Sequence, residues 1–91
     1  MDKSIKKLLA EHKNLVHSEK RKVTSHVQRR DGEWYVNTLM TEGCDAPFKY
    51  RRQKQYKSLN GKYVNLTYYP ASENVAGFEI EIMKVVRVRI S

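Results

Sequence analysis

The spacing of apolar and polar residues changes once along the chain, near residue 20. Before this point, a stripe of apolar residues and one histidine recurs at helical spacing, at Ile5, Leu8, Leu9, His12, Leu15 and Val16. This spacing places them on one face of an amphipathic helix. Asp2 or Ser4 can cap its start, and cations at 20–22 suit the negative end of its dipole. The pattern predicts a helix over residues 3–19.

From residue 22 onward, apolar and polar residues alternate, which is typical of β-strands. Asp31-Gly32 predicts a hairpin of strands 22–29 and 33–42, because glycine accepts positive φ. A breaker at 43–47 separates this hairpin from a third strand at 48–52. A fourth strand is expected at 62–69, where Pro70 ends it. A fifth spans 78–90, and its phase slips between Met83 and Val85, which indicates a bend, a bulge or a middle covered on both faces.

One helix followed by five strands predicts a mainly β (α+β) fold in a single domain, residues 1–91. We expect the N-terminal helix to pack on a five-stranded antiparallel curled sheet or a small SH3/OB-like barrel over about residues 22–91, or to pair with another copy. The run Leu59-Asn60-Gly61-Lys62-x-Val64 resembles strand entries in small barrels of the OB and SH3 type. OB folds usually place a helix between the third and fourth strands. Residues 53–60 leave little room for one, which favours an SH3-like or irregular barrel.

Composition narrows the class of protein. The chain has 91 residues, eighteen Lys and Arg against ten Asp and Glu, and a formal net charge of +8. This excess favours nucleic acid, an anionic membrane surface or an acidic protein as partner, or serves solubility alone. The single cysteine, Cys44, cannot form an internal disulfide, which fits a reducing compartment. No run has the length of a signal-peptide core or a membrane span, so a cytoplasmic location is expected.

Signals for catalysis and for metal binding are weak. Cys44 would need a nearby base to act as a nucleophile, and nothing in the sequence places His26 beside it. Glu79 and Glu81 alternate with apolar residues, as any exposed pair on a strand does. His12 and His17 are five residues apart on the expected helix, which turns them away from a shared ion. We therefore expect no enzyme, no cofactor and no metal site.

The densest cluster of candidate binding residues is the stretch 48–57, which holds five cations and three aromatics without an acid. Cations release counterions from nucleic acid, and aromatic rings stack on unpaired bases. Alternation along a strand would separate a cationic face from an aromatic face turned toward the core. A solubilising edge strand is the alternative interpretation. The expected contacts are to phosphate for the cations and to bases for the tyrosines: Lys49, Arg51, Arg52, Lys54, Lys57, Tyr50 and Tyr56.

A second basic cluster, Lys20, Arg21 and Lys22, joins the first or stands apart from it; the sequence leaves both arrangements open. Tyr35, Tyr63 and Tyr69 either form an exposed aromatic platform or lie under the helix. The leading hypothesis is a small non-enzymatic module that binds RNA or single strands through a basic and aromatic patch. The rival hypothesis is a protein-interaction module, as a homodimer or with an acidic protein partner.

Overall fold

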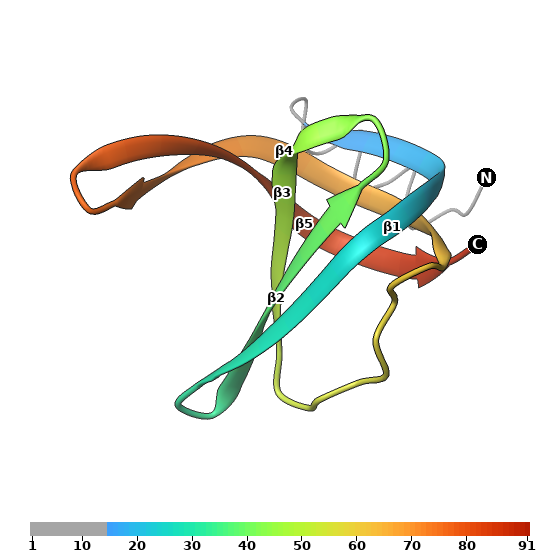
Figure 1. Cartoon of the computed structure of the whole chain (residues 1–91), viewed down its shortest axis with the longest axis horizontal. Coiled ribbons are helices and arrows are strands. Elements are labelled where there is room, and N and C mark those ends of the chain that lie inside the picture. The colour runs from blue at the N-terminus through green and yellow to red at the C-terminus, as the bar shows by residue number, and fades with distance from the viewer. Residues whose placement is uncertain (1–14) are drawn as a thin grey trace.

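The computed structural model describes residues 15–91, which form five β-strands and no helix (Figure 1). The strands are β1 (Val16–Asp31), β2 (Trp34–Thr41), β3 (Cys44–Arg52), β4 (Tyr63–Val75) and β5 (Phe78–Ile90). The expected helix lies outside the described residues over 3–14, and the prediction is wrong for 16–19. Those four residues begin β1, because their backbone pairs with β4, with Val16 opposite Tyr68 and Ser18 opposite Leu66.

The five strands form one mixed sheet that closes in the order β1-β2-β3-β5-β4. Closure depends on β1, which pairs with β4 through its first half and with β2 through its second half. Two register shifts bend β1 between these partners, and Lys20 takes a positive φ of 54° at the first of them. The expectation of a purely antiparallel sheet is wrong at one contact. Strands β3 and β5 run parallel, with Phe48 opposite Met83 and Lys49 opposite Lys84.

Strand boundaries differ from the sequence pattern where a residue has an unusual local environment. Residues 44–47 belong to β3, since the turn needs only Glu42 and Gly43, whose φ is 81°. Strand β4 continues through Pro70 to Val75. Proline is tolerated there because β1 no longer pairs with β4 beyond Tyr68, which leaves that side of β4 as an edge. The predicted irregularity in β5 is a bulge at Val86, since Thr67 faces Arg87 while Tyr68 faces Val85.

The core lies inside the closed sheet. Its buried apolar side chains come from four strands: Val23, Leu39, Phe48, Val64, Leu66 and Tyr68. Phe48 and Tyr68 meet edge to face, with ring centroids 4.8 Å apart and planes at 89°, a favoured aromatic arrangement. Thr67 is also buried, and its hydroxyl lies 3.0 Å from Nδ1 of His17. The inner face of β4 is thus packed as its alternation predicts.

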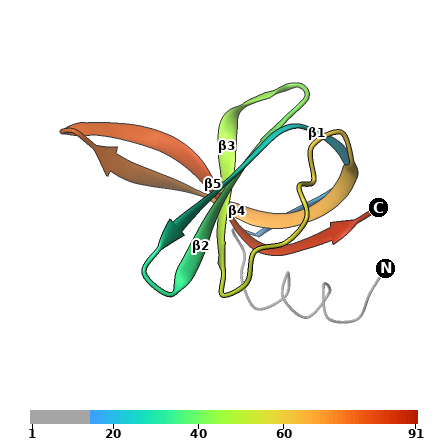
Figure 2. The same cartoon turned by 60° about the horizontal axis from the view of Figure 1, so that its bottom comes forward.

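Two hairpins and one long connection extend beyond this core. The β4–β5 arm, residues 71–82, projects from the barrel as a two-stranded ribbon, and the second view shows the same projection (Figures 1 and 2). The β1–β2 hairpin extends beside it and turns at Gly32, whose φ is 61°. The connection between β3 and β4, residues 53–62, contains no helix and crosses one end of the barrel. These three features frame two grooves.

Candidate nucleic-acid interface

Strand β3 divides the predicted basic and aromatic patch between two faces of the sheet. Phe48 is fully buried and Tyr50 packs against the core, so their side chains point inward. Lys49 and Arg51 point to the opposite face, as expected for alternate residues of a strand. Arg52 stays on the side of Tyr50, with its guanidinium carbon 5.2 Å from the centre of the tyrosine ring. The patch is therefore divided by β3, and Tyr50 lines the grooves on both sides of the strand.

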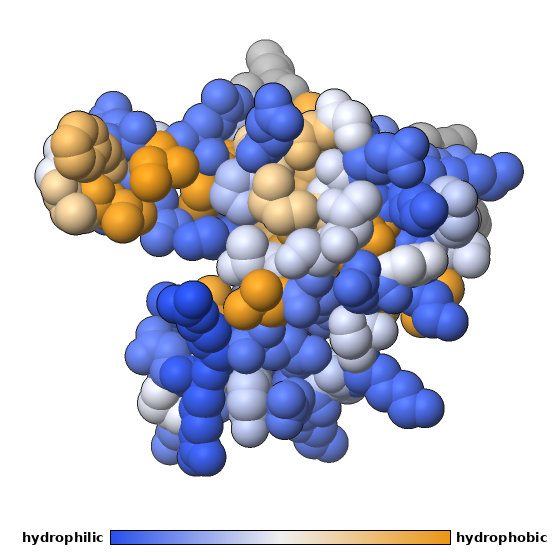
Figure 3. Space-filling model, in the orientation of Figure 1, coloured by the Kyte–Doolittle hydropathy of each residue, from blue (hydrophilic) through white to orange (hydrophobic). Residues whose placement is uncertain are grey.

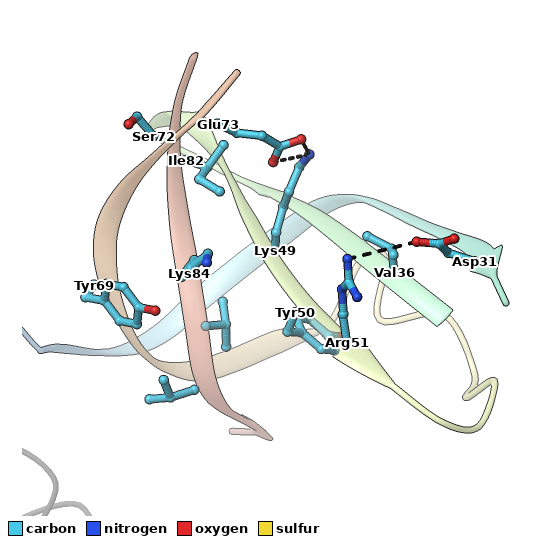
Figure 4. Close-up of a pocket in the computed structure, with 12 residues that line it drawn as sticks. Asp31, Val36, Lys49, Tyr50, Arg51, Tyr69, Ser72, Glu73, Ile82 and Lys84 are labelled. Carbon is cyan, nitrogen blue, oxygen red and sulfur yellow. Dashed lines mark hydrogen bonds and ion pairs between the residues drawn. The ribbon is translucent and has the colours of Figure 1, made fainter. Parts of the chain in front are cut away.

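The outer groove lies between the β4–β5 arm and the β1–β2 hairpin, and its volume is about 590 Å³ (Figure 3). Lys49 and Arg51 of β3 and Lys84 of β5 supply its cations, while Asp31 and Glu73 project from the two hairpins (Figure 4). Apolar and aromatic residues and one serine complete its lining: Val36, Tyr50, Tyr69, Ser72, Ile82, Val85 and Val86. This groove carries charges of both signs.

Two ion pairs occupy cations of the outer groove. The ammonium of Lys49 lies 3.0 and 3.2 Å from the two carboxylate oxygens of Glu73 (Figure 4). Arg51 and Asp31 are 3.9 Å apart, and both side chains are mostly exposed. Exposed pairs of this kind contribute about 0–1 kcal/mol because water screens them. A phosphate would still have to displace Glu73 before it could bind Lys49.

The basic groove lies at one end of the barrel, between β3 and the second half of β5, under the 53–62 connection. Its volume is about 580 Å³. Four cations line it, Arg52, Lys57, Lys62 and Arg89, and no described residue of its lining is acidic. The remaining lining is aromatic, apolar or neutral polar: Tyr50, Tyr56, Leu59, Val88, Ile90, His26, Asn37 and Ser58.

Two tyrosines give the basic groove its aromatic character. Tyr56 is 57% exposed, so one face of its ring is open to a ligand. Tyr50 is half-buried below it. Burial raises the pKa of the Tyr50 hydroxyl above its usual value of 10.0, and the neighbouring Arg52 guanidinium opposes part of this rise. Tyr50 therefore remains a neutral hydroxyl donor around pH 7.

Side chains of β1 hold the 53–62 connection in place. The amide group of Gln28 bonds both backbone groups of Tyr56, donating to its carbonyl at 2.6 Å and accepting from its N–H at 3.3 Å. Nδ1 of His26 accepts the N–H of Leu59 at 2.8 Å, which places the ring proton on Nε2, where Asn37 Oδ1 accepts it at 2.8 Å. These bonds fix one wall of the basic groove before any ligand arrives.

The predicted residues are only partly brought together. Tyr50, Arg52, Tyr56 and Lys57 share the basic groove, Lys49 and Arg51 line the outer groove, and exposed Lys54 lines neither. The second cluster, Lys20, Arg21 and Lys22, lies in the half of β1 that pairs with β4 and lines neither groove. The three tyrosines that the sequence left either exposed or covered share no groove. Tyr69 lines the outer groove, and Tyr35 and Tyr63 line neither groove.

Three groove cations were not predicted, namely Lys62, Lys84 and Arg89. Lys62 follows the Asn60-Gly61 turn, whose glycine N–H bonds Val23 of β1 and so brings the connection back to the barrel. Lys84 and Arg89 belong to β5, and only the parallel contact of β5 with β3 brings them near the predicted residues. The only local sequence signal for any of these three cations was the position of Lys62 directly after the turn at 60–61.

His26 and Cys44, the residues considered for catalysis, make separate contacts, and His12 lies outside the described residues. Both ring nitrogens of His26 are engaged by Asn37 and Leu59. The thiol of Cys44 lies instead 3.7 Å from the carbonyl of Ala46. Within residues 15–91, no three side chains of the His, Cys, Asp and Glu types are grouped to hold a metal ion. In that same part of the chain no helix has the length and apolar character needed to cross a membrane.

No protein-family model matches the chain, and no curated protein or solved structure resembles it at a significant level.

Proposed function

We propose that this chain is a module that binds single-stranded nucleic acid, RNA or DNA, in the basic groove. One observation carries the proposal: Arg52, Lys57 and Lys62 surround a hollow that contains two tyrosines and no acidic residue among its described lining. None of these three cations forms an ion pair with a described residue. They therefore remain available to phosphates, unlike Lys49 and Arg51.

The shape of the groove supports a single strand rather than a duplex. A strand with unpaired bases can bend into a concave site and place one base against the open face of Tyr56, which stacks regardless of base identity. The rigid cylinder of a duplex presents its phosphates on a convex surface and keeps its bases stacked inside. Sequence preference is expected to be weak, because stacking and phosphate contacts dominate.

The barrel topology supports nucleic-acid binding by this chain but not the choice of groove. We infer that the barrel is of the OB type rather than the SH3 type, since β1 pairs with both β2 and β4 while β3 meets β5 in parallel. OB barrels hold oligonucleotides on strands 2 and 3 and on the adjoining loops. In this chain that surface is the outer groove. We place the first contact in the basic groove instead, because two of the three outer cations, Lys49 and Arg51, are paired with Glu73 and Asp31.

Fluorescence anisotropy of a labelled 12-nucleotide RNA, with DNA of the same sequence and a duplex as comparisons, tests the proposal. Three phosphate contacts predict a salt slope of about −2, or roughly 20-fold weaker binding at 200 mM than at 50 mM salt. The triple variant Arg52→Gln, Lys57→Gln, Lys62→Gln should remove most of the affinity and the slope.

A matched control removes three charges elsewhere, through Lys20→Gln, Lys22→Gln and Lys54→Gln. The control should retain most of the binding, because these cations line neither groove. Equal losses in the two triple variants would mean that only net charge matters, and no binding by the wild-type chain at 50 mM salt would end the proposal. A Tyr56→Leu variant separates stacking, expected to contribute about 1–3 kcal/mol, from charge.

A further inference from the structure

Charge is strongly segregated along this chain. Residues 63–83 contain three acids, Glu73, Glu79 and Glu81, and no lysine or arginine. All eighteen cations lie elsewhere, together with only seven acids. The β4–β5 arm lies within this acidic segment, and it projects from a strongly basic body (Figure 1).

The end of the arm is also apolar on one face, while Glu73, which lies on that face beside Ile80, is paired with Lys49. Val75 pairs with Phe78 at its end, and Ile80 follows two residues further on, so these side chains share a face. Phe78 is 73% exposed, and Val75 and Ile80 are exposed as well. Figure 3 shows apolar side chains gathered at the end of the arm. The opposite face carries Glu79 and Glu81, both exposed and neither in an ion pair with a described residue.

An exposed apolar end on a monomer marks a contact surface, and the acids determine what it can contact. Two arms paired edge to edge about Ile80 would put Glu79 of one copy opposite Glu81 of the other. Like charges directly opposite each other destabilise a sheet. End-to-end contact of two arms would likewise bring Glu79 and Glu81 of one copy near the same acids of the other. An apolar hollow with a cationic rim complements both the apolar end and the acids of the arm.

The basic groove has these properties. Leu59, Val88 and Ile90 provide its apolar surface, while Arg52, Lys57 and Lys62 provide cations. No residue of the arm lines this groove, and the groove lies between β3 and the second half of β5, at the far end of β5 from the arm. The two surfaces therefore belong to different parts of one molecule and suit contact between different molecules.

We propose that the arm of one copy of this chain docks into the basic groove of a second copy. Phe78 and Val75 enter the apolar part of the groove, and Glu79 and Glu81 meet the cations of its rim. The contact joins two different surfaces, so it is head-to-tail and extends into a ring or a chain of copies. It needs no nucleic acid. Because it uses the groove proposed above for a single strand, oligonucleotide and arm compete for the same cations.

Sedimentation velocity of the full chain over a concentration series tests the proposal. The average mass should rise with concentration above the 10.8 kDa of one chain and fall when salt increases from 50 to 500 mM, since screening weakens the charge contacts. An arm variant, Glu79→Gln with Glu81→Gln, and a groove variant, Arg52→Gln with Lys57→Gln, should each sediment as monomers. Circular dichroism verifies that both remain folded.

Mixing the two variants provides the decisive measurement. An equimolar mixture contains one intact arm and one intact groove, so it should form a discrete dimer that cannot extend further. A control variant, Glu33→Gln with Glu42→Gln, removes two exposed acids outside the arm and should associate like the wild type. A wild-type chain that stays monomeric, a mixture that stays monomeric, or association that survives in either variant alone would overturn the proposal.

The outcomes separate this proposal from the proposed function. Assembly without any binding of a labelled 12-nucleotide RNA at 50 mM salt would refute the nucleic-acid function and leave the arm contact standing. RNA binding by a chain that is monomeric at every concentration would do the reverse. If both hold, adding RNA should return the assembly to single chains.

Discussion

The turn at the end of the β4–β5 arm contains an avoidable local strain. Ala76 and Gly77 form a two-residue turn with φ values of 50° and 86°. Positive φ at both positions is the type I′ hairpin geometry, for which Asn-Gly is the preferred sequence. Alanine in the left-handed region costs roughly 1–2 kcal/mol, because its Cβ approaches the following carbonyl, whereas asparagine tolerates this conformation. Ala76→Asn should therefore stabilise the arm by about 1 kcal/mol.

The full gain in free energy should be measurable in the arm, whether or not the stability of the barrel changes. Between Ala71 and Ile82 the two strands pair only with each other, so the arm can open without unfolding the core. A gain of about 1 kcal/mol should slow hydrogen exchange of the arm amides by a factor of about 5. Amides of Leu39 and Phe48 in the core serve as the internal reference and should change little.

A substitution series at position 76 tests the reasoning. Ala76→Gly relieves the strain but adds freedom to the unfolded chain, so its gain should be smaller than that of Ala76→Asn. Ala76→Val should accelerate exchange, since a β-branched side chain fits poorly at positive φ. The same asparagine at Ala71, a paired strand position, is a matched control and should not slow exchange. Unchanged or faster exchange in Ala76→Asn would refute the type I′ assignment.

Two further predictions concern polar groups in the barrel. The hydroxyl of Thr41 is buried without a hydrogen-bond partner, so Thr41→Val should raise the free energy of unfolding in urea by about 1 kcal/mol, since it removes an uncompensated polar group; a loss of stability would show that the hydroxyl is satisfied. Burial raises the pKa of Tyr50 above 10.0, so the folded chain holds this proton more tightly than the unfolded chain. The contribution of Tyr50 to the stability of the fold is complete below pH 10 and is lost as pH rises through the pKa that Tyr50 has in the folded chain. Tyr50→Phe should therefore lose less stability than the wild type between pH 8 and 10.5, and equal losses in both would contradict the assignment.

The sequence was informative where alternation and turn chemistry act locally. The two glycine turns at 32 and 61, the buried face of β4 and the limits of β5 follow from neighbouring residues alone. The inner face of β2 did not. Trp34, Val36 and Met40 share the more apolar face of this strand, yet the buried residues are Asn37, Leu39 and Thr41 on the other face. Asn37 is tolerated there because His26 and the carbonyl of Tyr35 satisfy its amide.

The candidate site was predictable only to the extent that it lies on one strand. Alternation on β3 correctly separated Lys49 and Arg51 from Tyr50 and Arg52. The parallel contact with β5 is a pairing across 35 residues, and no local pattern encodes it. Without that contact, Lys84 and Arg89 could not be grouped with the cations of β3. For the same reason, residues 16–19 were assigned to a helix, since only their pairing with β4 makes them a strand.

The short contact between β3 and β5 also bears on how the chain folds. Four of the five strand pairs are antiparallel, and three of these join neighbours in sequence, so hairpins can form early from local contacts. The parallel pair has only two matched positions, Phe48 with Met83 and Lys49 with Lys84, and it closes a long loop for few bonds. We expect this seam to close last on folding and to part first under force. The barrel is thus closed around its circumference, but its weakest strand pair is the one where the two grooves adjoin.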